Sequence, residues 1–545
     1  MQKEYSNSIE KSVERAVNLS YGITPRDLNK YTIGIIHAGT VGFEAETTQA
    51  IKYIEQGILH NECVPLVFSL YCPDDGIANM SGSPYNLPYR DILADSVQSL
   101  ISIHALDGVV LVANFDNAIS GLMMGAIRTS TPFIVSSIGI AHNIGNTNND
   151  ITQVLQGISR VKSGAINIEQ LQSIERNAMG KSLHTRLHSM ACIAEILGVT
   201  MNGNGTIPSN TNASSTFHIA IGHTICKAVQ DSIQPKMLLT PKAFDNAIAL
   251  ACAISASIDS IIHLIAIAYE CKIKLDLNTI QTISQKTPTL VAMHALGQST
   301  VDLYRAGGIS AVTNSLVSTD AIDGSTMCIN QKKLSQNVLH SYVDDEKVIY
   351  PTDAPYLSAG SIAVLVGNIA EEGAFIRRTP QNYNKPFVGR CKVYDSAMAA
   401  KTAILMGGII SAGDALVVRY EGTKGGPGMR DLYELYALLC GAGLSDSVAI
   451  VTDGRLSFAD GICVSCITPE CFNEGELALA RDGDKITIDI SKSKLELDIS
   501  SKEFKQRLKR YDYEPNNTNG WLERYSNNVQ PATSGAVLMV NRNKR

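Results

Sequence analysis

The sequence contains no long uncharged apolar run and no targeting segment. A helix that spans a bilayer needs ~20 consecutive, mostly apolar residues. The most apolar stretch, residues 247–269, is interrupted by Asp259 and His263, so we expect it to form a buried core helix. The first twenty residues mix charges of both signs and lack an apolar segment, so they do not resemble a secretory signal. We expect a cytoplasmic protein that has no membrane partner.

The chain also lacks an excess of positive charge. Its 46 Lys+Arg against 52 Asp+Glu give a formal net charge of -6, which offers no basic face for binding nucleic acid. We therefore expect a small-molecule partner. With 45% hydrophobic and 18% charged residues the chain is not disordered. Its 545 residues are enough for two or three domains whose cores need neither disulfides nor metal.

Standard metal, redox and nucleotide motifs are scarce. The single C-x-x-C pair, Cys463 and Cys466, lies in an alternating apolar run typical of a strand. Residues three apart on a strand point to opposite faces, so we do not predict a metal or redox site there. Neither a P-loop nor a post-strand G-x-G-x-x-G occurs, and no nucleotide is implied. The 12 cysteines are expected to be mostly free thiols in a reducing compartment.

In the first third of the chain, β-rich runs alternate with helix-length segments. The expected strands are 31–36, 64–68, 108–112 and 133–137, with helices at 45–59 and 88–105. Continuous apolar strands separated by helices predict a parallel sheet covered on both faces. From 150 to about 315 the pattern is mostly helical, and we expect these helices to flank the sheet.

After residue 376 the pattern changes to short strands separated by turns. The expected strands are 387–393, 414–420, 447–452, 485–490 and 494–499. Many short strands at modest spacing favour a barrel-like sheet. The sequence therefore predicts an α/β protein with two domains. Residues 1–375 form an N-terminal parallel-sheet α/β/α domain, and residues 376–545 form a C-terminal β-barrel-like domain.

Two motifs in the second half carry the strongest functional signals. The segment GTKGGPGM at 422–429 follows an expected strand and precedes a helical stretch at 430–439. Its glycines would let backbone N–H groups approach an anion or a metal site, although a tight strand-to-helix turn is the alternative. The segment TDGRLS at 452–457 ends a strand with an acid, a base and a hydroxyl. A serine there can become an activated nucleophile or base, or simply cap an Asp-Gly turn.

Together these motifs resemble the paired signature of the dihydroxy-acid, phosphogluconate and sugar-acid dehydratase family. Similar strings occur along nearly the whole chain: DGI at 75–77, LPYRDILADS at 87–96, DLYRAGGI at 302–309, VLVGN at 364–368 and SGA at 534–536. The resemblance implies an α/β N-terminal domain paired with a C-terminal β-barrel domain, in a homodimer. It also implies dehydration of 2,3-dihydroxy acids to 2-keto acids with an iron–sulfur cluster and Mg²⁺.

The resemblance assigns roles to individual residues. Asp75, Asp116 and Asp431 match the family's magnesium ligands, and three carboxylates suit a hard cation. Asn117 stands where the family has a lysine that is carbamylated. Ser457 matches the catalytic serine, which as an alkoxide would abstract the C2 proton of the substrate. The implied substrate-binding residues are Arg455, Gly426 and Gly428.

The implied ligands of the iron–sulfur cluster are missing. Phe115 occupies the position of the cysteine in the family's Cys-Asp-Lys motif, and Lys181 that of the cysteine in Cys-Gly-Gly. The first ligand is expected near Ala45, where no cysteine lies within fifteen residues. Such clusters need thiolates at fixed positions, and Cys72 and Cys192 have the wrong spacing to replace them. We therefore predict that the chain binds no cluster.

Three hypotheses about function follow. The leading one is a hydro-lyase for a small hydroxy or amino acid in a specialised biosynthetic pathway, which works with a divalent metal and without a cluster. In it Ser457 is the base and Lys181 supplies a proton or a charge where the iron stood. The second is a non-catalytic homologue that binds a small acid or pairs with an active subunit. The third, least compatible with Phe115, is an ordinary dihydroxy-acid dehydratase of branched-chain amino-acid synthesis.

Overall fold

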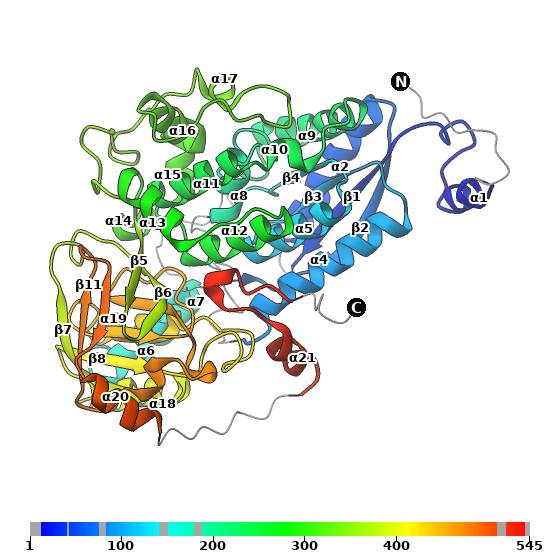
Figure 1. Cartoon of the computed structure of the whole chain (residues 1–545). Coiled ribbons are helices and arrows are strands. Elements are labelled where there is room, and N and C mark those ends of the chain that lie inside the picture. Colours follow the sequence, from blue (N-terminus) through cyan, green and yellow to red (C-terminus); the bar gives the residue numbers. More distant parts are fainter. Residues whose placement is uncertain are drawn as a thin grey trace.

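The computed structural model describes residues 12–40, 43–75, 83–140, 151–178, 188–509 and 519–539. Figure 1 shows two layered parts: a sheet wrapped by helices, drawn in blue to green, and a barrel with its own helices, drawn in yellow to orange. Both parts agree with the predicted α/β fold class.

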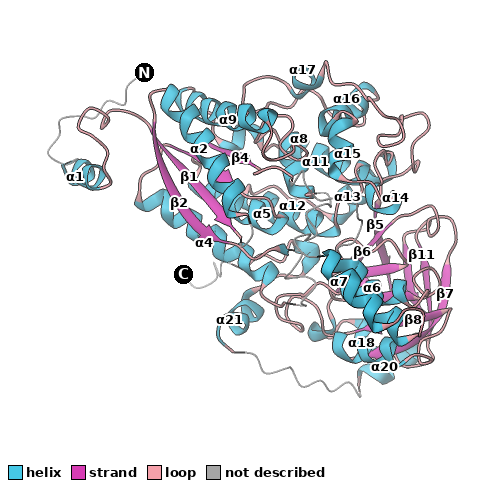
Figure 2. Ribbon diagram, turned by 180° about the vertical axis from the view of Figure 1, so that it is seen from behind, coloured by secondary structure: helices cyan, strands magenta, loops and turns pink. Residues whose placement is uncertain are grey.

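The N-terminal sheet has four parallel strands in the order β2-β1-β3-β4. Their bounds are β1 Thr32–Gly39, β2 Val64–Tyr71, β3 Gly108–Val112 and β4 Phe133–Ser136. These bounds confirm the four strands expected from the sequence. Helices α2 (Glu44–His60) and α9 (Asn212–Gln230) cover one face, and α4 (Asn86–Ile103) and α5 (Asp116–Thr129) the other (Figure 2). The strand order reverses between β1 and β3, and ligands of such sheets bind beyond the carboxyl ends at this switch point.

Helices α2 and α9 pack unusually closely on their shared face. A Cβ on Gly57 of α2 would lie 2.1 Å from the carbonyl oxygen of Ile219, and one on Gly222 of α9 would lie 2.3 Å from that of Ile54. Only glycine allows the two backbones to approach this far. The close packing fixes the position of one helix against the other.

The helical middle of the chain surrounds this sheet. The apolar stretch expected as one helix at 247–269 is two helices, α11 (Pro241–Ala253) and α12 (Ile258–Glu270). Each has an N-cap: Thr240 accepts from the N–H of Ala243, and Ser257 from that of Ser260. The break brings the start of α12 to the candidate site. In the described part of the chain, no helix is long and apolar enough to cross a bilayer.

The other helices before the barrel are mostly short. Their bounds are α1 Ser12–Ser20, α6 Ile151–Lys162, α7 Ile168–Ala178, α8 Ser189–Ile196, α10 Pro235–Leu238, α13 Leu277–Lys286, α14 Met293–Leu296, α15 Thr300–Arg305, α16 Gly308–Ser318 and α17 Leu334–Val338. Helix α6 is an example that departs from the expectation that the helices after 150 flank the sheet. Leu155 of α6 packs with Tyr433 and Ala437 of α19 (Tyr433–Gly441), so α6 lies against the barrel part.

The C-terminal part is a closed barrel with the strand order β10-β6-β5-β12-β11-β7-β8-β9. Its strands are β5 Ile362–Gly367, β6 Ala370–Arg377, β7 Phe387–Tyr394, β8 Asp414–Val418, β9 Ala449–Thr452, β10 Cys463–Thr468, β11 Lys485–Asp489 and β12 Lys494–Leu497. The five expected strands are all present, and Cys463 and Cys466 lie on a strand as expected. The helices that follow β6 are α18 Ala397–Met406, α19, α20 Ser501–Leu508 and α21 Gly520–Asn528, with short 3₁₀ turns at Cys471–Asn473, Glu476–Leu479 and Ala532–Ser534.

The barrel begins earlier in the chain than the boundary that we placed at 375. That boundary falls inside β6, and β5 precedes it. The two strands pair with each other, and they also pair with β12 and β10, which closes the barrel. The sequence division followed the change in turn composition, whereas hydrogen bonding assigns β5 and β6 to the barrel.

The last described segment returns to the N-terminal part (Figure 1). The buried guanidinium of Arg90 on α4 donates to the carbonyl oxygens of Gly535 (2.9 Å) and Ala536 (2.7 Å). Two of the strings that carry the family resemblance are therefore in direct contact. All twelve cysteines lie within the described residues, and none of them forms a disulfide there.

Candidate active site

Two of the predicted metal ligands lie together at the carboxyl edge of the sheet. Asp75 follows β2, and Asp116 begins α5 directly after β3. Asp75 accepts a hydrogen bond from the N–H of Asn117 (3.2 Å). Asp116 accepts from the N–H of Met190 (2.8 Å) and from the hydroxyl of Ser257 (3.4 Å). Since parallel strands end at the same edge, the fold brings these two carboxylates together although 41 positions separate them in the sequence.

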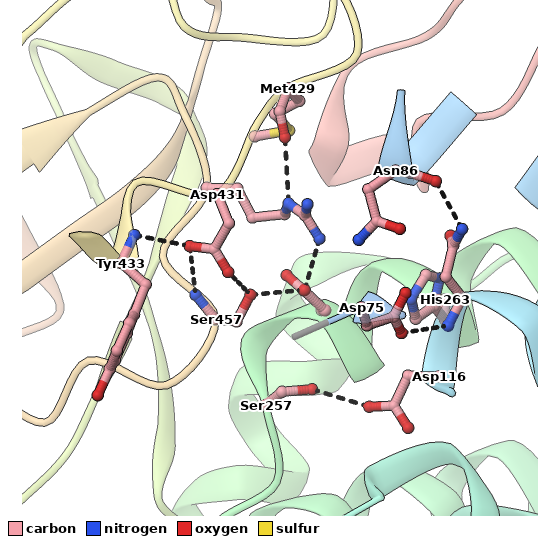
Figure 3. Close-up of polar contacts among 12 residues, drawn as sticks. Asp75, Asn86, Asp116, Ser257, His263, Met429, Asp431, Tyr433 and Ser457 are labelled. Carbon is pink, nitrogen blue, oxygen red and sulfur yellow. Dashed lines mark hydrogen bonds and ion pairs between the residues drawn. The ribbon is translucent and has the colours of Figure 1, made fainter. Parts of the chain in front are cut away.

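The third predicted ligand, Asp431, belongs to a separate hydrogen-bonded group around Ser457. The hydroxyl of Ser457 contacts the carboxylates of Asp431 and Asp259, at 2.6 Å from the latter. Asp259 also pairs with the guanidinium of Arg455 at 2.6 Å. All four side chains are buried. Figure 3 shows Asp431 and Ser457 on one side of the view, with Asp75 and Asp116 on the other.

Main-chain contacts hold this group in place across the two parts of the protein. The N–H of Ile258, the first residue of α12, donates to the carbonyl oxygen of Ser457 (3.1 Å). Arg455 donates through Nε to the carbonyl oxygen of Met429 (3.1 Å), and Asp431 accepts from the N–H of Tyr433 (2.9 Å). The barrel turn at 452–457 is thus fixed against the start of α12, which is why Ser457 and Asp259 meet.

Burial dominates the electrostatics of the site. It raises the pKa of Asp75 to about 7, that of Asp116 to about 8 and that of Asp431 to about 6. The charge of Asp259 acts in the same direction as burial on all three pKa values, whereas the positive charge of Arg455 lowers the pKa of Asp75 and of Asp431. Among the described residues, the four carboxylates of Asp75, Asp116, Asp259 and Asp431 thus lie within the electrostatic range of one another.

The carboxylates of the site are suitable ligands for a hard cation, but the structure does not arrange them as a metal site. Oδ1 of Asp75 and Oδ1 of Asp259 are buried and have no hydrogen-bond partner among the described residues, and carboxylate oxygens suit Mg²⁺. Yet within the described ranges no three His, Cys, Asp or Glu side chains are placed so that they could hold a metal ion. Asp431 is occupied by Ser457 and Tyr433 instead. The described residues therefore do not form a magnesium site as arranged, and the three ligands named from the sequence stay an untested prediction.

Asn117, at the position of the family's lysine, has a structural role in this chain. Its side-chain amide donates to the carbonyl oxygen of Asn86 (2.6 Å), the first residue of α4. Asn117 is 2% exposed. An amide cannot be carbamylated, so this position offers no additional charged oxygen to the site.

Aromatic rings fill the region where the resemblance places the cluster. Phe115, the N-cap of α5, is 6% exposed. Its ring lies edge-on to that of Phe43 at 6.3 Å between centroids, and 6.1 Å from that of His188. Phe43 is the N-cap of α2, two residues before Ala45. Phe43 and Phe115 thus follow β1 and β3, the strands on either side of the switch point. Lys181 lies outside the described residues.

The glycine-rich loop binds a side chain of the protein itself. The carboxylate of Glu470, after β10, accepts from the N–H groups of Lys424 (3.1 Å) and Gly425 (3.4 Å) and from the hydroxyl of Thr423 (3.2 Å). Gly428 has φ +89, and a Cβ there would lie 1.7 Å from the carbonyl oxygen of Pro84. Packing therefore accounts for this glycine. Contact of Gly426, Gly428 and Arg455 with substrate stays a prediction.

Asp259 was not predicted as a site residue. From the sequence we interpreted it only as a charge that interrupts an apolar stretch. A lone carboxylate in a segment that must be buried needs a partner, and that signal was available. The partner could not be read from the sequence, because Ser457 lies 198 positions away.

Comparisons with known proteins cover almost the whole chain. The dihydroxy-acid/6-phosphogluconate dehydratase N-terminal model matches residues 30–337, and the corresponding C-terminal model matches residues 347–536. A dihydroxy-acid dehydratase of Caldicellulosiruptor bescii is 35% identical over 543 residues, one of Acetivibrio thermocellus 35% over 547, and one of Pyrococcus abyssi 33% over 542. Each of these matches covers 97% of this chain and 98% of the relative.

Proposed function

The chain belongs to the dihydroxy-acid/6-phosphogluconate dehydratase family, and we propose that it removes water from a small 2,3-dihydroxy acid to give the 2-keto acid. It is an enzyme, a carbon–oxygen hydro-lyase. The names of the relatives favour a dihydroxy-acid substrate over an amino acid and over a non-catalytic role. They fit an ordinary dihydroxy-acid dehydratase better than our leading hypothesis, so the substrate class is taken from them. The group formed by Ser457, Asp259 and Asp431 carries the proposal.

The proton step follows from that group. Ser457 takes the C2 proton of the substrate while its own hydroxyl proton moves to the carboxylate of Asp259, 2.6 Å away. The electron pair of the C2–H bond forms the C2–C3 double bond, and the C3 hydroxyl leaves as water with the proton that Asp259 received, which restores the carboxylate while Ser457 keeps the former C2 proton as its hydroxyl proton. The enol then tautomerises to the keto acid. Arg455 holds Asp259 in position through their ion pair.

We propose further that the reaction proceeds without an iron–sulfur cluster. The support is the packing of Phe115 against Phe43 and His188, since a phenyl ring cannot replace a thiolate ligand. Cys72 and Cys192 are buried, and burial raises the pKa of both thiols well above the ordinary value. Neither thiol lies at a position that the resemblance assigns to a cluster ligand. Magnesium, the homodimer and the cytoplasmic location remain predictions, and no step above depends on them.

A direct assay tests the proposed activity. The purified full chain is incubated with a branched 2,3-dihydroxy acid or with 6-phosphogluconate, and 2-keto acid is measured as its hydrazone. We expect product from at least one substrate and a rate about 10²–10⁴-fold lower in Ser457→Ala, the range for loss of a proton-transfer group. Ser411→Ala, at an exposed position, is the matched control. Unchanged turnover in Ser457→Ala would rule out its role as the base.

A further inference from the structure

The start of the glycine-rich loop is anchored by the buried carboxylate of Glu470, which is 3% exposed. The N–H of Lys424 donates to both of its oxygens, at 3.2 and 3.1 Å. The N–H of Gly425 (3.4 Å) and the hydroxyl of Thr423 (3.2 Å) donate to it as well. Successive backbone N–H groups in a turn form a concavity that favours an anion. The loop therefore holds this carboxylate through several donors rather than through a single contact.

Glycines in both segments make room for this contact. A Cβ on Gly422 would lie 1.9 Å from Oε2 of Glu470, so only glycine leaves space for that oxygen. A Cβ on Gly475 would lie 2.0 Å from the carbonyl oxygen of Pro469, the residue before Glu470. One glycine thus accommodates the carboxylate, and the other accommodates the turn that presents it.

A second buried carboxylate, that of Asp453, joins the same two segments to the barrel turn at 452–457. It accepts from the N–H groups of Glu421 (3.0 Å) and Cys471 (2.9 Å). Glu421 directly precedes the glycine-rich loop, and Cys471 directly follows Glu470. The loop, the barrel turn and the segment around Glu470 are therefore bonded to one another.

The far end of the glycine-rich loop contacts the residues that hold the base. The carbonyl oxygen of Met429 accepts from Nε of Arg455 (3.1 Å), and the N–H of Leu432 donates to the carbonyl oxygen of Arg455 (2.8 Å). Between them, Asp431 contacts the hydroxyl of Ser457 (Figure 3). A shift of the loop would therefore move the hydrogen-bond partners of the base.

We propose that Glu470 is a positioning residue for the dehydration: by fixing the glycine-rich loop, it sets where Asp431 and Arg455 hold Ser457. This inference rests on the proposed function, and in this role Glu470 has no need to touch the substrate. A misplacement of about 1 Å far from the chemistry can lower a rate about 10²-fold. A carboxylate that anchors the loop can therefore control the rate of a proton transfer elsewhere in the site.

Glu470→Gln tests this role, and Glu474→Gln, at an exposed position four residues later, is the matched control. The glutamine keeps the volume of the side chain, but its NH₂ group cannot accept a hydrogen bond from the loop. Burial, followed by the charge of Asp453, raises the pKa of Glu470 to about 7. Both variants and the wild type are therefore compared at about pH 8.5, where the wild-type carboxylate is charged.

Hydrogen exchange followed by mass spectrometry reads the positioning without any activity. In Glu470→Gln we expect faster exchange at 423–425 and also at 429–433 and 452–457, whereas 108–112 stays unchanged because β3 belongs to the N-terminal sheet. Faster exchange confined to 423–425 would overturn the positioning role. Equal acceleration in all four segments would indicate a purely structural role and would overturn it as well.

Turnover measures the consequence for the base. We expect Glu470→Gln to lower kcat at least about tenfold. In a Ser457→Ala background it should lower kcat no further, because a residue that acts through Ser457 then has nothing left to position. Equal fold losses in the two backgrounds would contradict the proposal. If the wild type turns over no substrate, the proposed function fails, while the exchange pattern still decides whether Glu470 positions Ser457.

Discussion

Asp259→Asn is the substitution that probes the candidate site most sharply, because it changes one charge and almost no volume. The wild-type carboxylate is 7% exposed and lies 2.6 Å from the guanidinium of Arg455, which is 2% exposed. Removing one partner of a buried ion pair typically costs 3–5 kcal/mol. Since Asp431 and Asp75 also act on Arg455, we expect a loss near the lower end, about 3 kcal/mol. Turnover should fall as well, because Ser457 loses the acceptor of its proton.

Urea unfolding measures this loss by circular dichroism and by the fluorescence of Trp521, the only tryptophan. The two transitions must coincide for the free energy to be meaningful. Arg455→Met and the double variant Asp259→Asn/Arg455→Met complete a double-mutant cycle. Because the double variant removes both charges of the ion pair, we expect its loss of stability to be at least about 2 kcal/mol smaller than the sum of the two single losses. Additivity within about 0.5 kcal/mol would refute the coupling that we infer.

Three other substitutions test packing and ionisation. Gly428→Ala places a Cβ 1.7 Å from the carbonyl oxygen of Pro84 at φ +89, so it should destabilise the protein by about 1–3 kcal/mol, and wild-type stability would refute the packing role. Leu155→Ala, at a position 8% exposed between α6 and α19, should cost about 2–5 kcal/mol in urea unfolding. Glu195 is buried, which raises its pKa from 4.5 to about 7. The folded state therefore holds this proton more tightly than the unfolded state, and stability should fall as pH rises from 4.5 to 7, by up to about 3 kcal/mol. Glu195→Gln should flatten that fall, and an unchanged pH profile would contradict the shift.

Local pattern was sufficient for most of the fold. The apolar run at 108–112 coincides with β3 because a fully buried parallel strand is continuous in sequence. The break between α11 and α12 was missed, because apolar residues continue through it and only the cap at Ser257 marks it.

The side-chain contacts of the candidate site could not be predicted from the local sequence pattern. The family strings predicted Asp75, Asp116 and Ser457 as site residues, but not that Asp259 holds Ser457. Nor did they reveal that Glu470 fills the glycine-rich loop. Both contacts join segments far apart in the chain, 198 and 46 positions respectively. Such pairings depend on how α12 and β10 pack, which no local pattern encodes.

The central claim is that this family member dehydrates its substrate without an iron–sulfur cluster. One measurement tests it most directly: iron, acid-labile sulfide and turnover of a 2,3-dihydroxy acid, determined on the same anaerobically purified sample. We predict turnover in protein that contains no stoichiometric iron or sulfide, with no gain after cluster reconstitution. Stoichiometric iron and sulfide, or turnover that appears only after reconstitution, would contradict the account.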